Sequence, residues 1–173
     1  MIDARSVAVI ALGICAAVID WRTRRVPNAL TLGASAVGLA FAIADRGASG
    51  LGWSLGGWAV GLLVFLPLFA LRALGGGDVK LLAAFGAWLG PERVLWVAVY
   101  GAIAGGVLAV PFLLWRRRVG ATVANLSSLL LHFRIMGLKP HPTVTLDNRE
   151  SLRMPYALPI ALGALATLWL RVW

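Results

Sequence analysis

The chain has 173 residues, of which 60% are hydrophobic and only 13% are charged, and its mean hydropathy is +0.86. This composition excludes an ordinary soluble domain, because a soluble core could not bury so much apolar surface, and it predicts a membrane protein. The formal net charge of +9 does not indicate nucleic-acid binding, because the basic residues flank apolar segments and lack interleaved aromatic side chains.

Six apolar stretches predict an all-α, polytopic integral membrane protein with six transmembrane helices. The expected helices occupy residues 1–19, 29–44, 51–71, 79–89, 94–115 and 155–172. No cleavage site of a secretory signal follows the first stretch, so we expect it to be retained as a helix. Together the helices are expected to form a single membrane-embedded domain that covers residues 1–173.

The fourth stretch is too short to cross a bilayer alone, since about 20 apolar residues are needed to span the hydrocarbon core. One of its ends must therefore lie below the membrane surface, or the bilayer must thin there. The glycine run Gly75-Gly76-Gly77 precedes this stretch, and glycines permit the tight backbone path that a loop at membrane depth needs. We therefore expect Asp78, which follows the glycines, to lie in a water-filled recess.

Lysine and arginine residues are distributed unequally between the two ends of the expected helices. One set of connections holds most of them: Arg22, Arg24, Arg25, Arg72, Lys80, Arg116, Arg117, Arg118, Arg134, Lys139, Arg149 and Arg153. The other side holds only Arg5, Arg46, Arg93 and Arg171. By the positive-inside rule the richer side is cytoplasmic, so both termini face the periplasm and residues 116–154 form a cytoplasmic loop. We expect this basic side to contact anionic headgroups of the lipid bilayer.

Two aspartates, Asp20 and Asp78, fall on this cytoplasmic face, where an ionised carboxylate next to lipid is costly and indicates a function. Each also has an explanation without chemistry. Asp78 could cap the helix that it precedes. Asp20 could be neutralised by the arginines that follow it, although a carboxylate at a helix C-terminus opposes the helix dipole. Because both lie on one face beside turn-forming residues, we interpret the pair as a site.

Three sequence motifs resemble those of the type IV prepilin peptidases, a family of intramembrane aspartyl proteases. Residues 20–31 resemble the family's first motif, in which an aspartate is followed by an apolar residue, proline and asparagine. Residues 75–80, Gly-Gly-Gly-Asp-Val-Lys, resemble its second motif, Gly-x-Gly-Asp. Residues 154–160 resemble the stretch that opens its last helix, with Ala157 in place of a glycine. The first two motifs lie about sixty residues apart.

The resemblance implies a prepilin leader peptidase of the bacterial inner membrane, with Asp20 and Asp78 as its catalytic dyad. One carboxyl would act as the base toward water and the other as the acid, and the sequence leaves open which is which. The implied substrate is a single-span prepilin that is cut after a leader ending in glycine and carries a glutamate shortly after the cut. The pilus-assembly machinery is a further implied partner.

The longer members of that family carry an N-terminal zinc-binding cysteine cluster and methylate the new N-terminus of the pilin. This sequence has only Cys15 and no cluster before its first helix. It is therefore similar to the short, peptidase-only branch associated with type IVb, Flp-type (tight-adherence) pili, and we expect no methyltransferase activity. We also expect no cofactor and no metal, because His132 and His141 have no acidic or cysteine partner at metal-ligand spacing.

Glycines and arginines beside the aspartates are expected to bind the substrate. Gly75 and Gly77 are expected to shape the loop and to admit an extended substrate backbone. Arg24 and Arg25 are expected to attract an acidic group of the substrate near the membrane surface.

Two further polar residues have interpretations that need no contact with substrate. Asn28 is expected to cap the second helix, with contact to the substrate as the alternative. Lys80 is expected to extend toward the lipid headgroups, with an effect on the neighbouring Asp78 as the alternative.

Two other classes of function remain open from the sequence. A small transporter or channel subunit would also keep carboxylates in the membrane, but it would usually have two similar halves with paired broken helices, and the glycine-rich break occurs once here. A non-enzymatic scaffold for pilus assembly would tolerate the loss of either aspartate. The sequence does not predict the oligomeric state or name the pilin.

Overall fold

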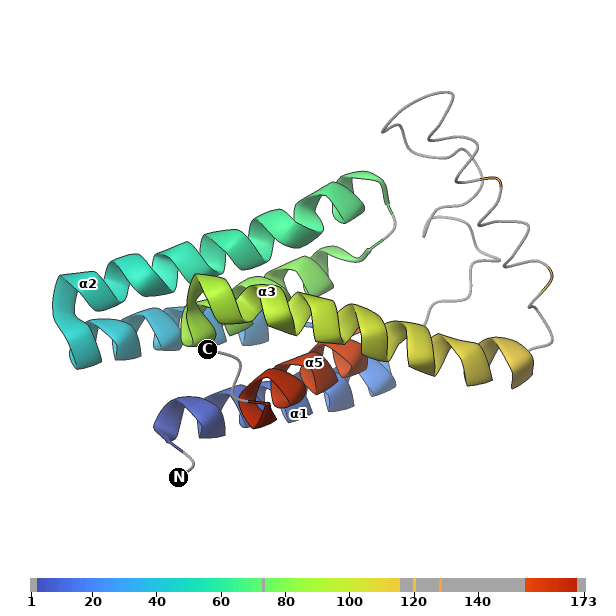
Figure 1. Cartoon of the computed structure of the whole chain (residues 1–173), viewed down its shortest axis with the longest axis horizontal. Helices are drawn as coiled ribbons and strands as arrows, with labels where there is room; N and C mark the ends of the chain where they lie inside the picture. The colour runs from blue at the N-terminus through green and yellow to red at the C-terminus, as the bar shows by residue number, and fades with distance from the viewer. Residues whose placement is uncertain (1–2, 73, 116–119, 121–127, 129–154, 171–173) are drawn as a thin grey trace.

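The structure is a computed structural model, and it describes residues 3–72, 74–115, 120, 128 and 155–170. Its regular structure is all helical, as expected. The described residues form four helical elements (Figure 1): α1 (Ala4–Thr23), α2 (Asn28–Ala70), α3 (Gly76–Trp115) and α5 (Ala157–Trp169). Apart from residues 120 and 128, the expected cytoplasmic loop 116–154 lies outside the described residues.

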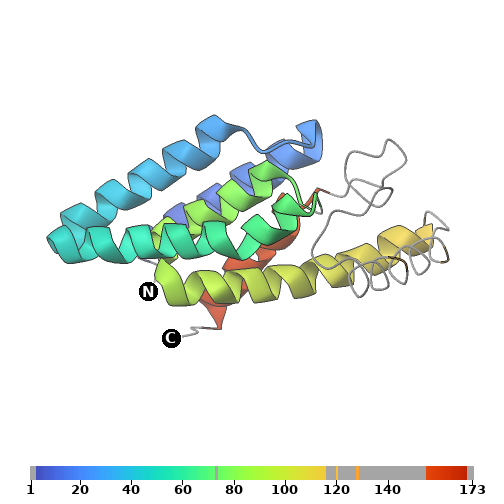
Figure 2. The same cartoon turned by 90° about the horizontal axis from the view of Figure 1, so that it is seen from above.

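α2 and α3 each reverse direction at one glycine. Gly47 has φ 61° and ψ −139°, and Gly90 has φ 81° and ψ 177°, conformations that glycine adopts without the strain a side chain would cause. α2 therefore has two arms, residues 28–46 and 48–70, and α3 has the arms 76–89 and 91–115. In each element the second arm returns toward the end of the molecule where the first arm began (Figure 2).

The four elements replace the six separate helices expected from the sequence. The gaps expected at residues 45–50 and 90–93 lie inside α2 and α3, because one glycine is enough to turn the backbone and helical hydrogen bonding resumes at once. By length and composition, three of the described helices, α1, α2 and α3, can cross a membrane, whereas α5 has only 13 residues. The prediction of an all-helical membrane protein is confirmed, and the count of six spanning helices is not.

The first arm of α3, which the sequence analysis took as a short fourth helix, lies at the centre of the fold. Leu81, Leu82 and Phe85 have no exposed surface, and Val79 and Leu89 are nearly as buried. α1, α2 and α5 all contact α3 and lie around this arm (Figures 1 and 2). A helix that neighbours cover on all sides is apolar all round, which explains why this segment has no polar face.

Small residues bring the backbones of α2 and α3 into contact where the two helices cross. A side-chain carbon on Gly57 would collide with the carbonyl oxygen of Gly86. At the same crossing, the buried Ser54 hydroxyl donates a hydrogen bond of 2.6 Å to the Ala87 carbonyl. Small residues and interhelical hydrogen bonds are typical of helix packing within membranes.

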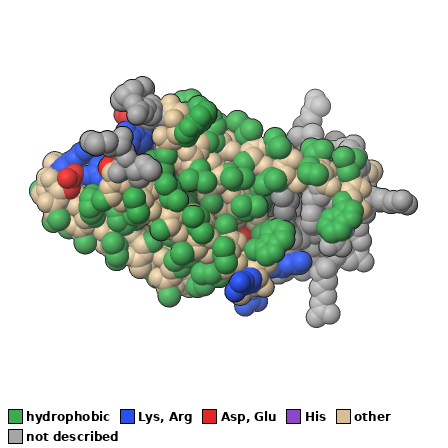
Figure 3. Space-filling view, turned by 90° about the horizontal axis from the view of Figure 1, so that it is seen from below, with side chains coloured by type: hydrophobic (Ala, Val, Ile, Leu, Met, Phe, Trp, Pro, Cys, Tyr) green, Lys and Arg blue, Asp and Glu red, His purple; other side chains and the backbone are tan. Residues whose placement is uncertain are grey.

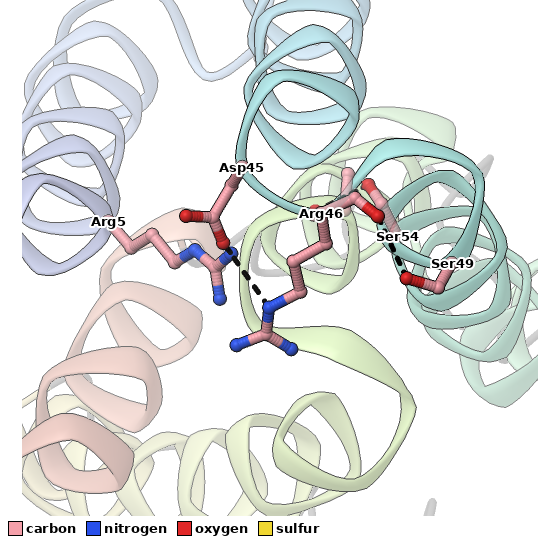
Figure 4. Close-up of polar contacts among 6 residues, drawn as sticks. Arg5, Asp45, Arg46, Ser49 and Ser54 are labelled. Atoms are coloured by element: carbon pink, nitrogen blue, oxygen red, sulfur yellow. Dashed lines mark hydrogen bonds and ion pairs between the residues drawn. The ribbon is translucent and has the colours of Figure 1, made fainter.

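A cluster of charged and aromatic side chains joins the start of α1 to the turn of α2. Arg5 and Arg46 both pair with the Asp45 carboxylate, and the Arg46 Nε lies 3.2 Å from its oxygen (Figure 4). The two guanidinium groups also lie over the Trp53 ring, at 5.2 Å and 5.6 Å from its centroid. The cluster therefore holds together the end of the molecule that lies away from the α1–α2 connection.

On the face shown in Figure 3, apolar side chains cover most of the middle, and Lys and Arg side chains gather toward the ends of the described part. On α1, Val7 and Ile14 are about half exposed, and Ile103, Val107 and Val110 on the second arm of α3 are exposed to a similar extent. Continuous apolar surface of this kind is rare on soluble monomers and is expected where a protein faces lipid.

Candidate active site

Asp20 lies in the last turn of α1, which continues to Thr23 instead of ending at residue 19 as expected. The α1 helix ends where the Arg24 amide donates a 2.7 Å hydrogen bond to the Asp20 carbonyl and Arg24 takes a left-handed conformation, with φ 53°. The Asp20 side chain points into the protein, and the residue is only 5% exposed. A buried carboxylate needs a partner, so the contacts of this side chain matter.

The partner of the Asp20 carboxylate is the start of α5. Its Oδ2 accepts a 3.1 Å hydrogen bond from the backbone amide of Ala157, the first residue of α5. Tyr156, at the N-cap position of α5, makes no side-chain capping bond, so Asp20 takes that role from another helix. The positive end of the α5 dipole also favours a negative charge at this point. Asp20 is thus stabilised by α5, and the arginines that follow it are not needed to explain its charge.

Asp78 is the third residue of α3, which begins at Gly76. Its amide donates a 3.1 Å hydrogen bond to the Gly75 carbonyl within the first helical turn. The alternative in which Asp78 occupies the N-cap position is therefore excluded, because α3 begins at Gly76, three residues before the expected start at residue 79. A side-chain carbon on Gly75 would lie 3.2 Å from the Asp78 Oδ2, so a glycine leaves room for this carboxylate.

The two aspartates line one cavity of about 280 Å³, at the end of the molecule where α1 ends and α3 begins. The cavity brings together every residue that the sequence analysis assigned to the site. Its lining residues are Asp20, Arg24, Arg25, Val26, Gly75, Gly76, Gly77 and Asp78. The aspartates come from α1 and α3, and the rest of the lining comes from the α1–α2 and α2–α3 connections and the first turn of α3.

The α1–α2 connection touches the first turn of α3 beside the cavity. A side-chain carbon on Gly77 would lie 3.2 Å from the Cβ of Val26, which is nearly buried. Next to this contact, the Lys80 Nζ donates a 2.9 Å hydrogen bond to the Asn28 Oδ1.

The Lys80–Asn28 bond corrects two expectations. The N-cap residue of α2 is Pro27, which makes no side-chain capping bond, and Asn28 is the first residue of the helix. Asn28 therefore does not cap α2, because its side-chain oxygen accepts from Lys80 instead. Lys80 correspondingly reaches a protein partner instead of extending freely toward the lipid headgroups.

The sequence analysis did not assign Tyr156 and Val26 to the site. Tyr156 lies directly before α5, and its hydroxyl is near enough to Asp78 to be affected by the aspartate's charge. The resemblance of residues 154–160 to a third motif indicated that this segment matters, but it did not predict which residues the segment contacts. The signal for Val26 was its place in the first motif, as the apolar residue before the proline.

The described residues contain no cluster of three or more histidine, cysteine, aspartate or glutamate side chains able to hold a metal ion. His132 and His141 lie outside the described residues. Cys15 is free and exposed on α1.

A sequence profile described as the type IV leader peptidase family matches residues 7–110 of the chain, a range that contains both aspartates. The chain belongs to the type IV leader peptidase family. This finding confirms the resemblance noted from the motifs, and it agrees with the helical membrane fold described above.

Curated relatives of this leader peptidase family member carry the name prepilin leader peptidase/N-methyltransferase. One, from Burkholderia pseudomallei (strain 1026b), is 35% identical over 124 residues, which is 65% of this chain and 40% of the relative. The relative from Dickeya chrysanthemi is 39% identical over 111 residues, 58% of this chain and 37% of the relative. The chain therefore matches less than half the length of these relatives. No solved structure matches it significantly.

Proposed function

We propose that this chain is an aspartic-type prepilin leader peptidase in which Asp20 and Asp78 form the catalytic dyad. The observation that carries the proposal is the shared cavity, where carboxylates from α1 and α3 converge beside a glycine-rich loop. The family membership and the printed names of the relatives support the same activity. Two carboxyl groups are sufficient for peptide hydrolysis, because one can accept a proton from water while the other gives a proton to the leaving group.

The cavity suits a substrate that arrives as an extended segment. Gly75 and Gly77 line it without side chains, so backbone can approach backbone there. Arg24 and Arg25 line the same cavity and supply positive charge. We propose that they attract the glutamate that follows the cleavage site of a prepilin, with a pilin of the type IVb, Flp class as the substrate.

The direct test is to incubate the purified protein in detergent with a candidate prepilin and S-adenosylmethionine. Mass spectrometry of the product should reveal loss of the leader peptide and a new, unmethylated N-terminus. A methylated product would contradict the peptidase-only assignment. No cleavage of any Flp-type or other prepilin would contradict the proposed function and favour a scaffold, while cation or proton flux in reconstituted vesicles would favour a transporter.

Replacing the glycine before the cleavage site of the prepilin by leucine is expected to block cleavage. The cavity is small, at about 280 Å³, and any side chain next to the scissile bond must share it with the two carboxylates. The rate of leader release by mass spectrometry measures the effect. A leucine placed several residues earlier in the leader is the control and should be cut normally. Equal cleavage of both substrates would show that the cavity does not hold this glycine.

Replacing Arg24 and Arg25 together by glutamine is expected to raise KM by about 10-fold, equivalent to roughly 1.4 kcal/mol of binding, and to leave kcat nearly unchanged. The reason is that the two charges would draw in the substrate without taking part in the proton transfers. Steady-state kinetics at two salt concentrations should detect a weaker salt dependence in the variant. Arg22→Gln is the matched control, since Arg22 precedes the same connection but does not line the cavity. A fall in kcat with KM unchanged would contradict this role.

We also propose that the arms of α2 and α3 enter the bilayer separately, so that with α1 and α5 the chain has six helices in the bacterial inner membrane. The first arm of α3 and the 13-residue α5 are too short to cross the hydrocarbon core alone, so the bilayer thins there or one end of each lies below the membrane surface. A straight 43-residue helix would be about twice as long as the ~30 Å hydrocarbon core, and the turn at Gly47 halves that length. The cavity end carries the basic connections and would face the cytoplasm.

This topology predicts that a reporter fused after Trp173 is periplasmic and that one inserted at His141 is cytoplasmic; both positions lie outside the described residues. Alkaline phosphatase and green fluorescent protein fusions distinguish the two sides. A cytoplasmic signal after Trp173 would contradict the orientation, and with it the cytoplasmic location of the site.

A further inference from the structure

The two aspartates belong to different helices, so their relative position depends on how the connections beside them are joined. Asp20 precedes the α1–α2 connection, residues 24–27, and Asp78 follows the α2–α3 connection, residues 71–75. The contact between Val26 and Gly77 brings the α1–α2 connection against the first turn of α3. Such a contact is non-directional, because van der Waals attraction alone allows one surface to slide along the other.

The Lys80–Asn28 hydrogen bond is directional, so it can fix the relative position of the two segments, which packing alone does not. It joins the first residue of α2 to the first turns of α3, with 2.9 Å between Nζ and Oδ1. A charged donor makes it stronger and shorter than a neutral bond. Residues two apart on a helix do not face each other, so Lys80 reaches away from Asp78 toward α2. The lysine thus acts between helices and not on the neighbouring carboxylate.

We propose that Asn28 and Lys80 are positioning residues that fix the α1–α2 connection against the start of α3 and so hold Asp20 and Asp78 at a working separation. The proposal rests on the proposed function, because it assigns the pair a role in the same reaction. Neither side chain lines the cavity, so neither is a substrate contact. Losing the bond should leave substrate binding intact and reduce the fraction of bound complexes in which both carboxyl groups are aligned.

Cleavage kinetics of four single variants and one double variant at these positions, with a fifth single variant as the control, test this pairing. Asn28→Leu and Lys80→Met each remove the bond and are expected to lower kcat by about 10- to 100-fold with KM unchanged, since a displacement near 1 Å can cost that much. The double variant should lose no more than either single one. Asn28→Asp keeps an acceptor and Lys80→Arg keeps a donor, so both should retain most of the activity. Ser49→Ala, which removes a hydrogen bond to the Arg46 carbonyl at the far end of the molecule, should act like the unmodified protein (Figure 4).

A second measurement does not depend on cleavage. In a Cys15→Ser background, the pair Val26→Cys and Gly77→Cys should form a disulfide quickly with copper phenanthroline, because the two Cβ positions are 3.2 Å apart. Adding Asn28→Leu or Lys80→Met is expected to slow this crosslink several-fold, whereas Ser49→Ala should not. Unchanged crosslinking together with unchanged kcat, or additive losses in the double variant, would overturn the pairing. Failure of the unmodified protein to cut any prepilin would instead count against the proposed function, and the crosslinking rates would still decide whether the pair holds the α1–α2 connection against the start of α3.

Discussion

Asp20→Asn and Asp78→Asn should each abolish leader cleavage, with a loss in kcat of at least about 10³-fold. Each carboxyl has its own proton transfer in one hydrolytic step, and an amide can neither accept nor deliver that proton. The double variant should be no slower than the single ones, because residues that act as a unit are not additive. Timed digestion of a prepilin in detergent, followed by mass spectrometry, measures the loss.

Asparagine is the informative replacement because it preserves the contacts. In the Asp20→Asn protein the new side chain would keep an oxygen to accept the Ala157 amide, so α5 should still dock as it does on Asp20. Asp20→Ala would remove that acceptor and cost about 1–3 kcal/mol of stability in addition to activity. Asp45→Asn, at the opposite end of the molecule, is the matched control and should cut normally. Clear activity in either the Asp20→Asn or the Asp78→Asn protein would contradict the assignment of the two aspartates as a catalytic dyad.

Gly57→Ala should destabilise the protein by about 2 kcal/mol or more, which is large for the addition of one methyl group. The new carbon would collide with the Gly86 carbonyl and lie 2.7 Å from the Gly90 Cα, so the two helices would have to separate. Their separation would also disturb the buried first arm of α3, which contains Asp78 in its first turn.

The neighbouring residue provides the control for this prediction. Gly56 has no atom within 4 Å of its side-chain position, so Gly56→Ala should be neutral or should stabilise the helix by about 0.5–1 kcal/mol. Thermal unfolding of both variants in the same detergent, followed by circular dichroism, compares them directly. Equal melting temperatures for the two variants would show that α2 and α3 do not pack at Gly57.

The pairing of Asp20 with Asp78 could be predicted because it depends on local signals. The charge asymmetry predicted that both lie on one side of the membrane, and the glycine run marked the loop before Asp78. The structure brings the two aspartates into one cavity. The turns at Gly47 and Gly90 could not be predicted in the same way. The chain has 20 glycines, and nothing local separates those that reverse the backbone from those that sit inside helices at close crossings, such as Gly57.

Long-range polar contacts also escaped prediction. The sequence suggested that Asn28 caps its own helix, but its acceptor is used by Lys80, which is 52 residues away along the chain. Local capping rules describe isolated helices, and a partner from another helix can override them. The same limit applied to Asp20. Its position at the end of α1 looked unfavourable because the sequence does not show that the start of α5 donates a hydrogen bond to it.

The bond between Asp20 and the Ala157 amide also bears on the order in which the protein can assemble. Its two ends are 137 residues apart, so α1, α2 and α3 are all synthesised before the donor exists. Until α5 arrives, the Asp20 carboxylate has either water or an unfavourable apolar environment around it, and burying it unpaired would cost several kcal/mol. A partly synthesised chain therefore holds one of its two carboxyl groups out of place. The proposed proteolytic centre is therefore complete only after its last described helix has been synthesised.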